Sequence, residues 1–383
     1  MLFTFALAVA VNCHKGEQPT NVIFVNQNSP GPAHDGESWA TAYLSVKDCL
    51  AATPDSGEVW VAAGTYTGCI KMQMRFGLYL YGGFAGTETR REQRNWSVNQ
   101  TVLDGNQEGT VVTVSSLMSR ACIDGFTIRN GLDTAVTGCG GGIHCHLDDI
   151  GYLTVANNLI TDNMACAGAG IYLEECNSKI INNVITRNRT HGSSLPIGGG
   201  IYCYLFAGSI LNNLITENSS WNGAGIYTSL QGGMIANNVI SQNHGYGIFV
   251  DREESTPSII NNTITFNSEA GIFTVWANMA YITNNIVAFD TVGIDAFDGV
   301  LPPQLHCNCV FGNVDSNYRS VEPGSGDISL DPTLSGYHLQ AGSPCINRGD
   351  NSAIPQGWTD IDGEARTGAG QVDIGADEYY SSK

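Results

Sequence analysis

Asn182-Asn183-Val184-Ile185-Thr186-Arg187-Asn188 decides the fold, because close copies of this stretch recur along the chain. Each copy has a pair of asparagines, an apolar dipeptide and, five residues after the second asparagine, a further Asn or Asp. The pairs are Asn157/Asn158, Asn182/Asn183, Asn212/Asn213, Asn237/Asn238, Asn261/Asn262 and Asn284/Asn285. The steps between second asparagines, 158 to 183, 213, 238, 262 and 285, are 25, 30, 25, 24 and 23 residues. This spacing is typical of a solenoid.

A second marker, Gly-Ile followed by a ring residue in most copies, accompanies each pair. The runs between the markers are short, rich in Ile, Val, Thr and Tyr, and separated by Gly and Asn turns, which favours strands over helices. One apolar column is predicted for Val155, Ile180, Ile210, Ile235, Ile259, Ile282 and Leu305, and another for Ile171, Ile201, Ile226, Ile248, Ile272 and Ile294. The second asparagines predict a ladder of amides at the strand spacing of about 4.8 Å. Together these features predict an all-β, right-handed parallel β-helix.

The composition restricts the partners. The chain of 383 residues has 17 Lys and Arg against 36 Asp and Glu, which gives a net charge of −19 with 14% charged residues. Such acidity argues against nucleic acid and anionic membrane surfaces, which require a basic face. It suits a protein in salty or calcium-containing surroundings.

Leader and domain boundaries follow from changes in pattern. Residues 1–20 contain an apolar run, Leu2 to Val11, that is too short to span a bilayer and favours a secretion signal. Residues 21–101 are predicted to form an N-terminal cap and the first rungs, with one capping helix over Leu44 to Ala52, where Ser45 caps and Pro54 stops the helix. Residues 102–314 form the repeats, and residues 315–383, rich in Gly, Pro and Asp, are expected to cap the other end.

Twelve cysteines in a chain with a secretion signal suggest disulfides. Cys139 and Cys166 lie four and five residues before the isoleucines of successive rungs. We therefore expect these two cysteines to pair.

Two blocks resemble a known family. The segments SWATAYLSVKDCL (38–50), EVWVAAGTY (58–66) and LYGGFAGTE (80–88) resemble the opening of secreted bacterial right-handed parallel β-helix repeat proteins. The segments GSPCINRGD (342–350), TDIDGEARTG (359–368) and QVDIGADEYY (371–380) resemble the choice-of-anchor Q domain that often closes them. The resemblance implies the fold and a secreted or cell-surface location, whereas fold alone does not give an activity.

Ring side chains directly follow the Gly-Ile isoleucines, and strand alternation places them on the outer face. This row is a candidate platform for sugar rings. The alternative is a self-stacking ladder that stabilises the sheet. The candidate carbohydrate-binding residues are Tyr172, Tyr202, Tyr204, Tyr227, Phe249, Phe273 and Trp221.

A group of carboxylates and histidines in the first Asn-pair rungs is a candidate calcium site, because oxygen ligands suit this cation. It comprises Asp148, Asp149, Glu174 and Glu175, with His144 and His146 beside them. Lys179, Arg187, Arg189 and His191 are the candidate bases for β-elimination on a uronate polymer. The alternative is that these are solvated turn charges. Asp360, Asp362, Glu364, Asp373 and Asp377 also offer calcium ligands, although Asp-x-Asp-Gly at 360–363 is more typical of turns.

Three functions are compatible with these patterns. We favour non-catalytic binding of extracellular polysaccharide, because polar and aromatic rows are present and no recognised catalytic constellation is. The alternatives are a calcium-dependent polysaccharide lyase and a structural protein that associates with copies of itself.

Overall fold

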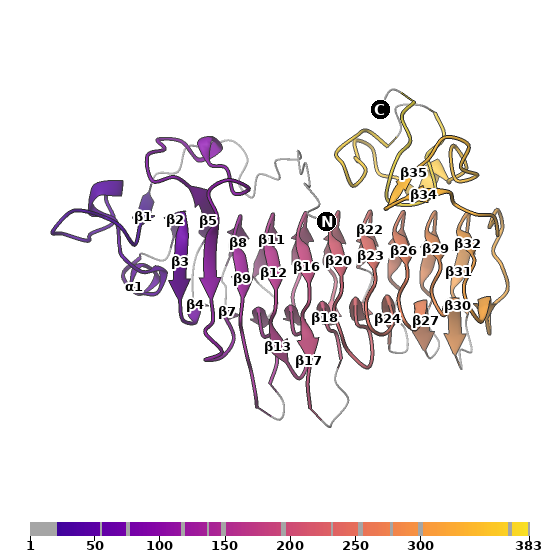
Figure 1. Ribbon diagram of the computed structural model, residues 1–383, viewed down its shortest axis with the longest axis horizontal. Helices are drawn as coiled ribbons and strands as arrows, with labels where there is room; N and C mark the ends of the chain where they lie inside the picture. Colours follow the sequence, from indigo (N-terminus) through magenta and orange to yellow (C-terminus); the bar gives the residue numbers. More distant parts are fainter. Residues whose placement is uncertain are drawn as a thin grey trace. The chain divides into compact units, whose positions relative to one another are not determined.

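The computed structural model describes residues 21–53, 56–73, 77–115, 119–135, 138–146, 151–192, 197–230, 233–251, 256–275, 279–297, 302–366 and 370–381. They fall into two compact units, residues 21–192 and residues 197–381. The leader predicted for residues 1–20 lies outside the described residues. Both units are built from short parallel strands, three to a turn (Figure 1).

In the first unit, three parallel sheets, named here A, B and C, run along the solenoid. Sheet A contains β1 (Val22–Val25), β2 (Gly57–Ala62), β5 (Leu78–Phe84), β8 (Arg120–Asp124), β11 (Tyr152–Ala156) and β15 (Lys179–Ile181). Sheet B contains β3 (Gly64–Thr67), β6 (Thr101–Asp104), β9 (Thr127–Arg129), β12 (Leu159–Thr161) and β16 (Val184–Thr186), and sheet C contains β4 (Ile70–Gln73), β7 (Val112–Ser115), β10 (Ile143–His146) and β14 (Ile171–Glu174). A small extra sheet pairs β13 (Met164–Ala165) with β17 (Arg189–Thr190).

The second unit has the same three sheets. Its sheet A strands are β19 (Ser209–Leu211), β22 (Met234–Ala236), β25 (Ser258–Ile260), β28 (Tyr281–Thr283) and β31 (Gln304–His306). Sheet B contains β20 (Leu214–Thr216), β23 (Val239–Ser241), β26 (Thr263–Thr265), β29 (Ile286–Ala288) and β32 (Cys309–Phe311), and sheet C contains β18 (Ile201–Phe206), β21 (Ile226–Leu230), β24 (Ile248–Val250), β27 (Ala270–Val275), β30 (Val292–Phe297) and β33 (Ser316–Arg319).

The predicted apolar columns fill the interior of each unit. In the first unit Val155 is in register with Ile180, and Ile143 with Ile171. In the second unit the register joins Ile210, Ile235, Ile259, Ile282 and Leu305 in sheet A, and Ile201, Ile226, Ile248, Ile272 and Ile294 in sheet C. The isoleucines of both columns have no exposed surface. Burial of each isoleucine side chain stabilises the fold by roughly 2 kcal/mol. A single turn alone cannot bury these side chains, because their partners lie in the neighbouring turns.

The predicted asparagine ladder is also confirmed. Oδ1 of Asn262 accepts hydrogen bonds from the backbone N and from Nδ2 of Asn238, both at 3.0 Å. Its Nδ2 donates to the carbonyl oxygen of Ile235 at 2.9 Å and to Oδ1 of Asn285 at 2.9 Å. Asn158 and Asn183 repeat this pattern in the first unit. The preceding asparagine of each pair has φ between 52° and 59°, a left-handed conformation that asparagine tolerates better than most residues, so it turns the chain sharply between sheets A and B.

A second ladder runs through the asparagines that end each copy of the motif. Asn243 and Asn267 repeat the same bonds, and Nδ2 of Asn267 also donates to the carbonyl of Ile240 at 3.1 Å. The next position in this ladder is Asp290. Its Oδ1 accepts from the backbone N and Nδ2 of Asn267, at 2.7 and 3.0 Å. The carboxylate therefore occupies a place built for an amide.

At the N-terminal end, the predicted capping helix is α1 (Val46–Ala52), with Ser45 as N-cap accepting from the backbone N of Asp48. Val46, Cys49 and Leu50 of this helix are buried. Two short 3₁₀ turns, η1 (Trp39–Thr41) and η2 (Arg91–Gln93), lie in the connecting loops of this unit. Within the residues described, no helix has the length and apolar character needed to cross a membrane.

The C-terminal residues do two different things. Residues 316–328 lie against the last turn: β33 pairs with β30, Ile328 bridges to Cys309, and Oδ1 of Asp327 accepts from the backbone N and Nδ2 of Asn308, ending the first ladder. The rest, residues 334–381, which we call the C-terminal segment, returns along the outer face of sheet B of the second unit (Figure 1). It contains β34 (Leu334–Ser335), β35 (His338–Leu339) and η3 (Asn351–Ala353). Of the residues 315–383, which are expected to cap the solenoid, residues 316–328 thus lie at the last turn and the C-terminal segment lies along sheet B.

Apolar residues and asparagines hold the C-terminal segment in place. Leu339, Cys345 and Ile374 pack against Ile286, Ala288 and Cys309, while Ile361 and Ala376 pack against Val239. The outer asparagines of four successive pairs donate from Nδ2 to its backbone carbonyls: Asn212 to Asp360, Asn237 to Thr359, Asn261 to Asp373 and Gly375, and Asn284 to Asp350. The asparagine pair thus has two jobs, one inside the solenoid and one outside.

The predicted Cys139–Cys166 disulfide is wrong for this structure, in which both residues are thiols. The backbone register explains the difference, because Cys139 is bridged to Ala167 rather than to Cys166. Cys166 itself lies in a bend, where its backbone N donates to the carbonyl oxygen of Gly138.

A different pair is placed for oxidation. The thiols of Cys309 and Cys345, both without exposed surface, are in hydrogen-bonding contact where the C-terminal segment meets β32. We expect glutathione disulfide to oxidise the two thiols to a disulfide, while it is itself reduced to two molecules of glutathione. The new disulfide is expected to raise the free energy of unfolding by about 2 kcal/mol. Non-reducing peptide mapping checks the bond. Cys345→Ser abolishes it, whereas Cys49→Ser leaves it intact; recovery of both thiols alkylated after oxidation contradicts the prediction.

Candidate functional site

The outer face of sheet C in the first unit carries two rows of polar side chains, which together we call the polar face. The strand register aligns them from β4 through β7 and β10 to β14. One row is Lys71, Thr113, His144 and Tyr172, and the other is Gln73, Ser115, His146 and Glu174. The alternating residues of these strands, such as Met72, Val114 and Cys145, are buried inside. Neighbouring members of a row are one strand spacing apart, about 4.8 Å.

Two contacts organise the end of the polar face at β14. Nδ1 of His146 lies 3.4 Å from Oε2 of Glu174, and their side chains are 43% and 31% exposed. The rings of His144 and Tyr172 meet edge to face with centroids 5.1 Å apart. Burial lowers the pKa of His144, although the Glu174 carboxylate opposes the shift. The lowered pKa favours the neutral imidazole of His144, which can accept a proton.

The segments that connect sheets B and C in this unit form further parallel pairs beside the polar face. Asp133 N donates to Met164 O, Leu132 bridges to Met164, and β13 pairs with β17. His191 lies at the same edge, with Nε2 2.8 Å from the carbonyl oxygen of Asp133. The Asp133 carboxylate acts electrostatically on His144, so this edge borders the polar face.

The four predicted bases are dispersed. Lys179 is on β15 of sheet A, and Arg189 is exposed on β17. Arg187 pairs with Asp162, NH2 to Oδ2 at 3.0 Å, at a turn. His191 alone borders the polar face. Of the predicted metal ligands, Glu174 belongs to the polar face, Glu175 follows it as an exposed residue with φ of 51°, and Asp148 and Asp149 lie outside the described residues.

The aromatic row of the second unit forms a stack. The centroids of Tyr202 and Tyr227 are 5.2 Å apart, those of Tyr227 and Phe249 are 5.1 Å apart, both at 14°, and Phe249 and Phe273 follow at 4.9 Å. Tyr202, Tyr227 and Phe249 are only 8–9% exposed, as is Tyr172 in the first unit. The ring faces contact one another, which stabilises the sheet by about 0.5–1.5 kcal/mol per pair. Sugar stacking on these faces would require the stack to open, whereas Trp221 is 75% exposed and Tyr204 is half-buried.

Four residues of the polar face were missed by sequence reasoning: Lys71, Gln73, Thr113 and Ser115. Their strands, Ile70–Gln73 and Val112–Ser115, show the alternation of a half-buried strand. They lack the Gly-Ile marker, so the repeat alone does not place them in sheet C. Alternation was the available signal.

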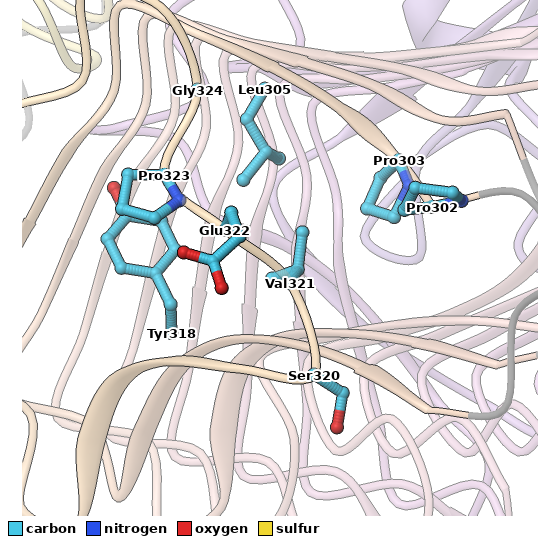
Figure 2. Close-up of a pocket in the computed structure, with 9 residues that line it drawn as sticks. All are labelled: Pro302, Pro303, Leu305, Tyr318, Ser320, Val321, Glu322, Pro323 and Gly324. Carbon is cyan, nitrogen blue, oxygen red and sulfur yellow. The ribbon is translucent and has the colours of Figure 1, made fainter.

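An open pocket of roughly 640 Å³ lies in the second unit, where residues 302–305 face residues 318–324 (Figure 2). Its lining residues are Pro302, Pro303, Leu305, Tyr318, Ser320, Val321, Glu322, Pro323 and Gly324. Glu322 is the one ionisable carboxylate among them, and the Tyr318 hydroxyl donates to Oδ2 of Asp327 at 2.9 Å. This lining offers neither a pair of carboxylates nor a cation, so the polar face is the stronger candidate.

Comparison with known proteins agrees with this architecture. Residues 123–292 match a family described as a right-handed beta-helix region. The structure is similar to that of pectate lyase Pel9A, with a TM-score of 0.56 and 15% identity over 94% of this chain and 96% of that chain. Weaker likenesses are to the A-module of mannuronan C-5 epimerase AlgE4 of Azotobacter vinelandii (TM-score 0.45, 16% identity, 82% of this chain and 83% of that chain) and to the pectin methylesterase of Aspergillus niger (TM-score 0.40, 12% identity, 83% and 93%). No curated protein sequence matches the chain.

Proposed function

We propose that this right-handed parallel β-helix, a fold that a pectate lyase shares, is secreted and binds extracellular polysaccharide on the polar face. The observation that carries the proposal is the alignment of hydroxyl, amide, imidazole, ammonium and carboxylate groups in two rows across four strands. Rows of hydrogen-bond donors and acceptors at the strand spacing suit a ligand that presents hydroxyl groups at regular intervals.

The side chains of this face have complementary roles in such binding. Thr113, Ser115 and Gln73 donate and accept hydrogen bonds without charge, which suits neutral sugar hydroxyls. Lys71 attracts a uronate carboxylate, whereas Glu174 repels one unless a cation lies between them. Calcium, with its preference for carboxylate and hydroxyl oxygens, supplies such a bridge. The proposal therefore covers neutral polymers directly and uronate polymers with calcium present.

Binding is tested by affinity electrophoresis and calorimetry against neutral and uronate polysaccharides, with calcium and then with chelator. Ser115→Ala with neutral polymers, and Glu174→Gln with uronate polymers in calcium, are each expected to weaken binding about fivefold, the effect of one hydrogen bond of about 1 kcal/mol. Glu217→Gln, at an exposed turn of the second unit, removes an equal charge and serves as the control. Wild-type affinity in both polar-face variants would remove this surface as the binding site.

Lyase activity is the second candidate, and the neutral imidazole of His144 on the same face as Lys71 favours it. β-Elimination requires a base beside the uronate carbon that loses a proton and a cation that neutralises the carboxylate. A calcium-dependent rise in ultraviolet absorbance from the unsaturated product, lost in His144→Ala, supports the lyase. A flat trace across the uronate panel leaves binding alone. Light scattering of the same samples tests the third candidate, self-association.

A further inference from the structure

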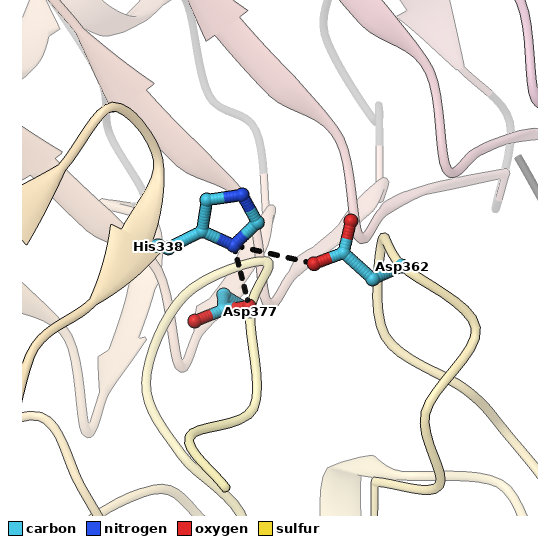
Figure 3. Close-up of side chains that lie close together, drawn as sticks. All are labelled: His338, Asp362 and Asp377. Carbon is cyan, nitrogen blue, oxygen red and sulfur yellow. Dashed lines mark hydrogen bonds and ion pairs between the residues drawn. The ribbon is translucent and has the colours of Figure 1, made fainter. Parts of the chain in front are cut away.

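Three side chains of the C-terminal segment converge on one point (Figure 3). Nδ1 of His338, on β35, lies 3.1 Å from Oδ1 of Asp377 and 3.2 Å from Oδ2 of Asp362. All three atoms are within 4.8 Å of one another. The three residues are far apart in the sequence of the segment, so their meeting depends on the folded segment and not on a local sequence motif.

The other acidic residues of the segment have a different use. Asp360 accepts hydrogen bonds from the backbone N of Asp362, Glu364 and Glu378, and Asp373 accepts from those of Asn347 and Tyr379. These carboxylates stabilise turns, which is the role that the sequence pattern of this region favours over a calcium site. Asp362 and Asp377 are the two whose carboxylates face Nδ1 of His338.

Asp377 is held in a fixed position. Its side chain is 5% exposed, and its Oδ2 accepts the backbone N–H of Leu339 at 2.8 Å, which directs Oδ1 toward His338. His338 and Asp362 are 40% and 22% exposed, so the side of the cluster away from Asp377 is open to solvent. One ligand is thus buried and oriented, and the cluster can still admit an ion and its water.

We propose that His338, Asp362 and Asp377 bind a divalent transition-metal ion of the zinc type. Ligand atoms about 2.1 Å from one ion lie about 3.4 Å apart at a tetrahedral angle and about 3.0 Å apart at a right angle. The 3.1 and 3.2 Å separations fall between these limits. Without an ion, the single Nδ1–H position faces two carboxylate oxygens at once, whereas one dication serves all three ligands.

The ligand types select among metals. An imidazole nitrogen with two carboxylates suits zinc, while calcium and magnesium prefer oxygen ligands throughout. Three protein ligands leave at least one position for water. The site joins β35 to the turns around residues 362 and 377, so the bound ion is expected to strengthen the segment that covers sheet B.

The test uses the full chain after treatment with chelator, titrated with Zn²⁺, Mn²⁺ and Ca²⁺ by calorimetry and by thermal unfolding. We expect one equivalent of Zn²⁺ to bind and to raise the unfolding temperature. His338→Gln and Asp377→Asn are each expected to weaken zinc binding more than about tenfold. His306→Gln, which removes a histidine paired with Asp350 at 3.4 Å, is the matched control and should bind zinc as the wild type does.

Asp362→Asn distinguishes loss of zinc binding from misfolding, because it removes a ligand and leaves the hydrogen bond between Asp377 and Leu339 in place. Unfolding of each metal-free variant near the wild-type temperature shows that the segment is intact. Failure to saturate with one zinc ion, or equal zinc affinity in wild type and all three ligand variants, would reduce the cluster to an ion pair. Preference for calcium over zinc at this site would overturn the choice of metal.

Discussion

Asp290→Asn is expected to stabilise the protein on the order of 3 kcal/mol at neutral pH, the cost associated with an uncompensated buried charge. Asp290 is fully buried in the second asparagine ladder, and its Oδ2 has no hydrogen-bond partner among the described residues. The amide nitrogens of Asn267 and Asn313 in this ladder donate to the carbonyls of Ile240 and Val287. The equivalent carbonyl for position 290 is that of Ile264, which lies between them in the register. Asparagine supplies that donor; a carboxylate does not.

The pH dependence gives the prediction its sign. Burial raises the pKa of Asp290 well above its usual value, although hydrogen bonds from Asn267 oppose the shift. Its neutral form therefore contributes stability that is present below the pKa of the unfolded chain, about 3.9, and is lost as the pH rises toward the folded pKa. The advantage of Asp290→Asn should be small near pH 4 and grow toward neutrality.

Chemical unfolding of wild type and Asp290→Asn between pH 4 and pH 8 measures this difference. Asp251→Asn is the control, since Asp251 accepts from the Tyr227 hydroxyl and is half-buried on the outer face. A stability difference that stays constant over the pH range, or a loss of stability in Asp290→Asn, would show that the carboxylate is compensated.

Asn262→Ala is expected to destabilise the protein by about 4 kcal/mol, at the upper end of single-substitution effects. The change leaves the backbone N and Nδ2 of Asn238, the carbonyl of Ile235 and Oδ1 of Asn285 without the partner that Asn262 provides. Each buried polar group left unsatisfied costs about 1–3 kcal/mol, and relaxation of the alanine site recovers part of that sum.

The matched control for this ladder is Asn177→Ala, an exposed asparagine of the first unit, for which a change within about 0.5 kcal/mol is expected. Circular dichroism during unfolding reports both variants. Similar stability of Asn262→Ala and Asn177→Ala would mean that backbone pairing alone holds the turns together, and that the side-chain ladder is dispensable.

Repetition determined how much of the fold was predictable. The isoleucine columns and the inner asparagines recur once per turn, so their register followed from the spacing, as the pairs Ile235 to Ile259 and Asn238 to Asn262 show. The position of the C-terminal segment did not follow, because it depends on one-off contacts such as Asn284 with Asp350. Its apolar partners Val239 and Ile286 stand outside the solenoid at places where a solvated sheet would carry polar residues.

The candidate sites were harder to predict from the sequence, because most of their residues do not recur from turn to turn. His146 and Glu174 were placed together because each lies three residues beyond its Gly-Ile isoleucine, and the register confirms this pairing. Lys71 and Ser115 lie on strands of solenoid turns that lack the Gly-Ile marker. The meeting of His338 with Asp362 and Asp377 joins β35 to two irregular segments, whose mutual position only the folded chain reveals.

The outer asparagines also restrict the number of repeats in the solenoid. A solenoid usually gains or loses whole repeats through duplication or deletion, because each turn contacts only its neighbours. Here the C-terminal segment contacts Asn212, Asn237, Asn261 and Asn284 in four successive copies. An extra repeat inserted between residues 213 and 284 would shift the anchors after it, relative to those before it, by one strand spacing of about 4.8 Å. The C-terminal segment therefore fits only the present number of turns in this part of the second unit.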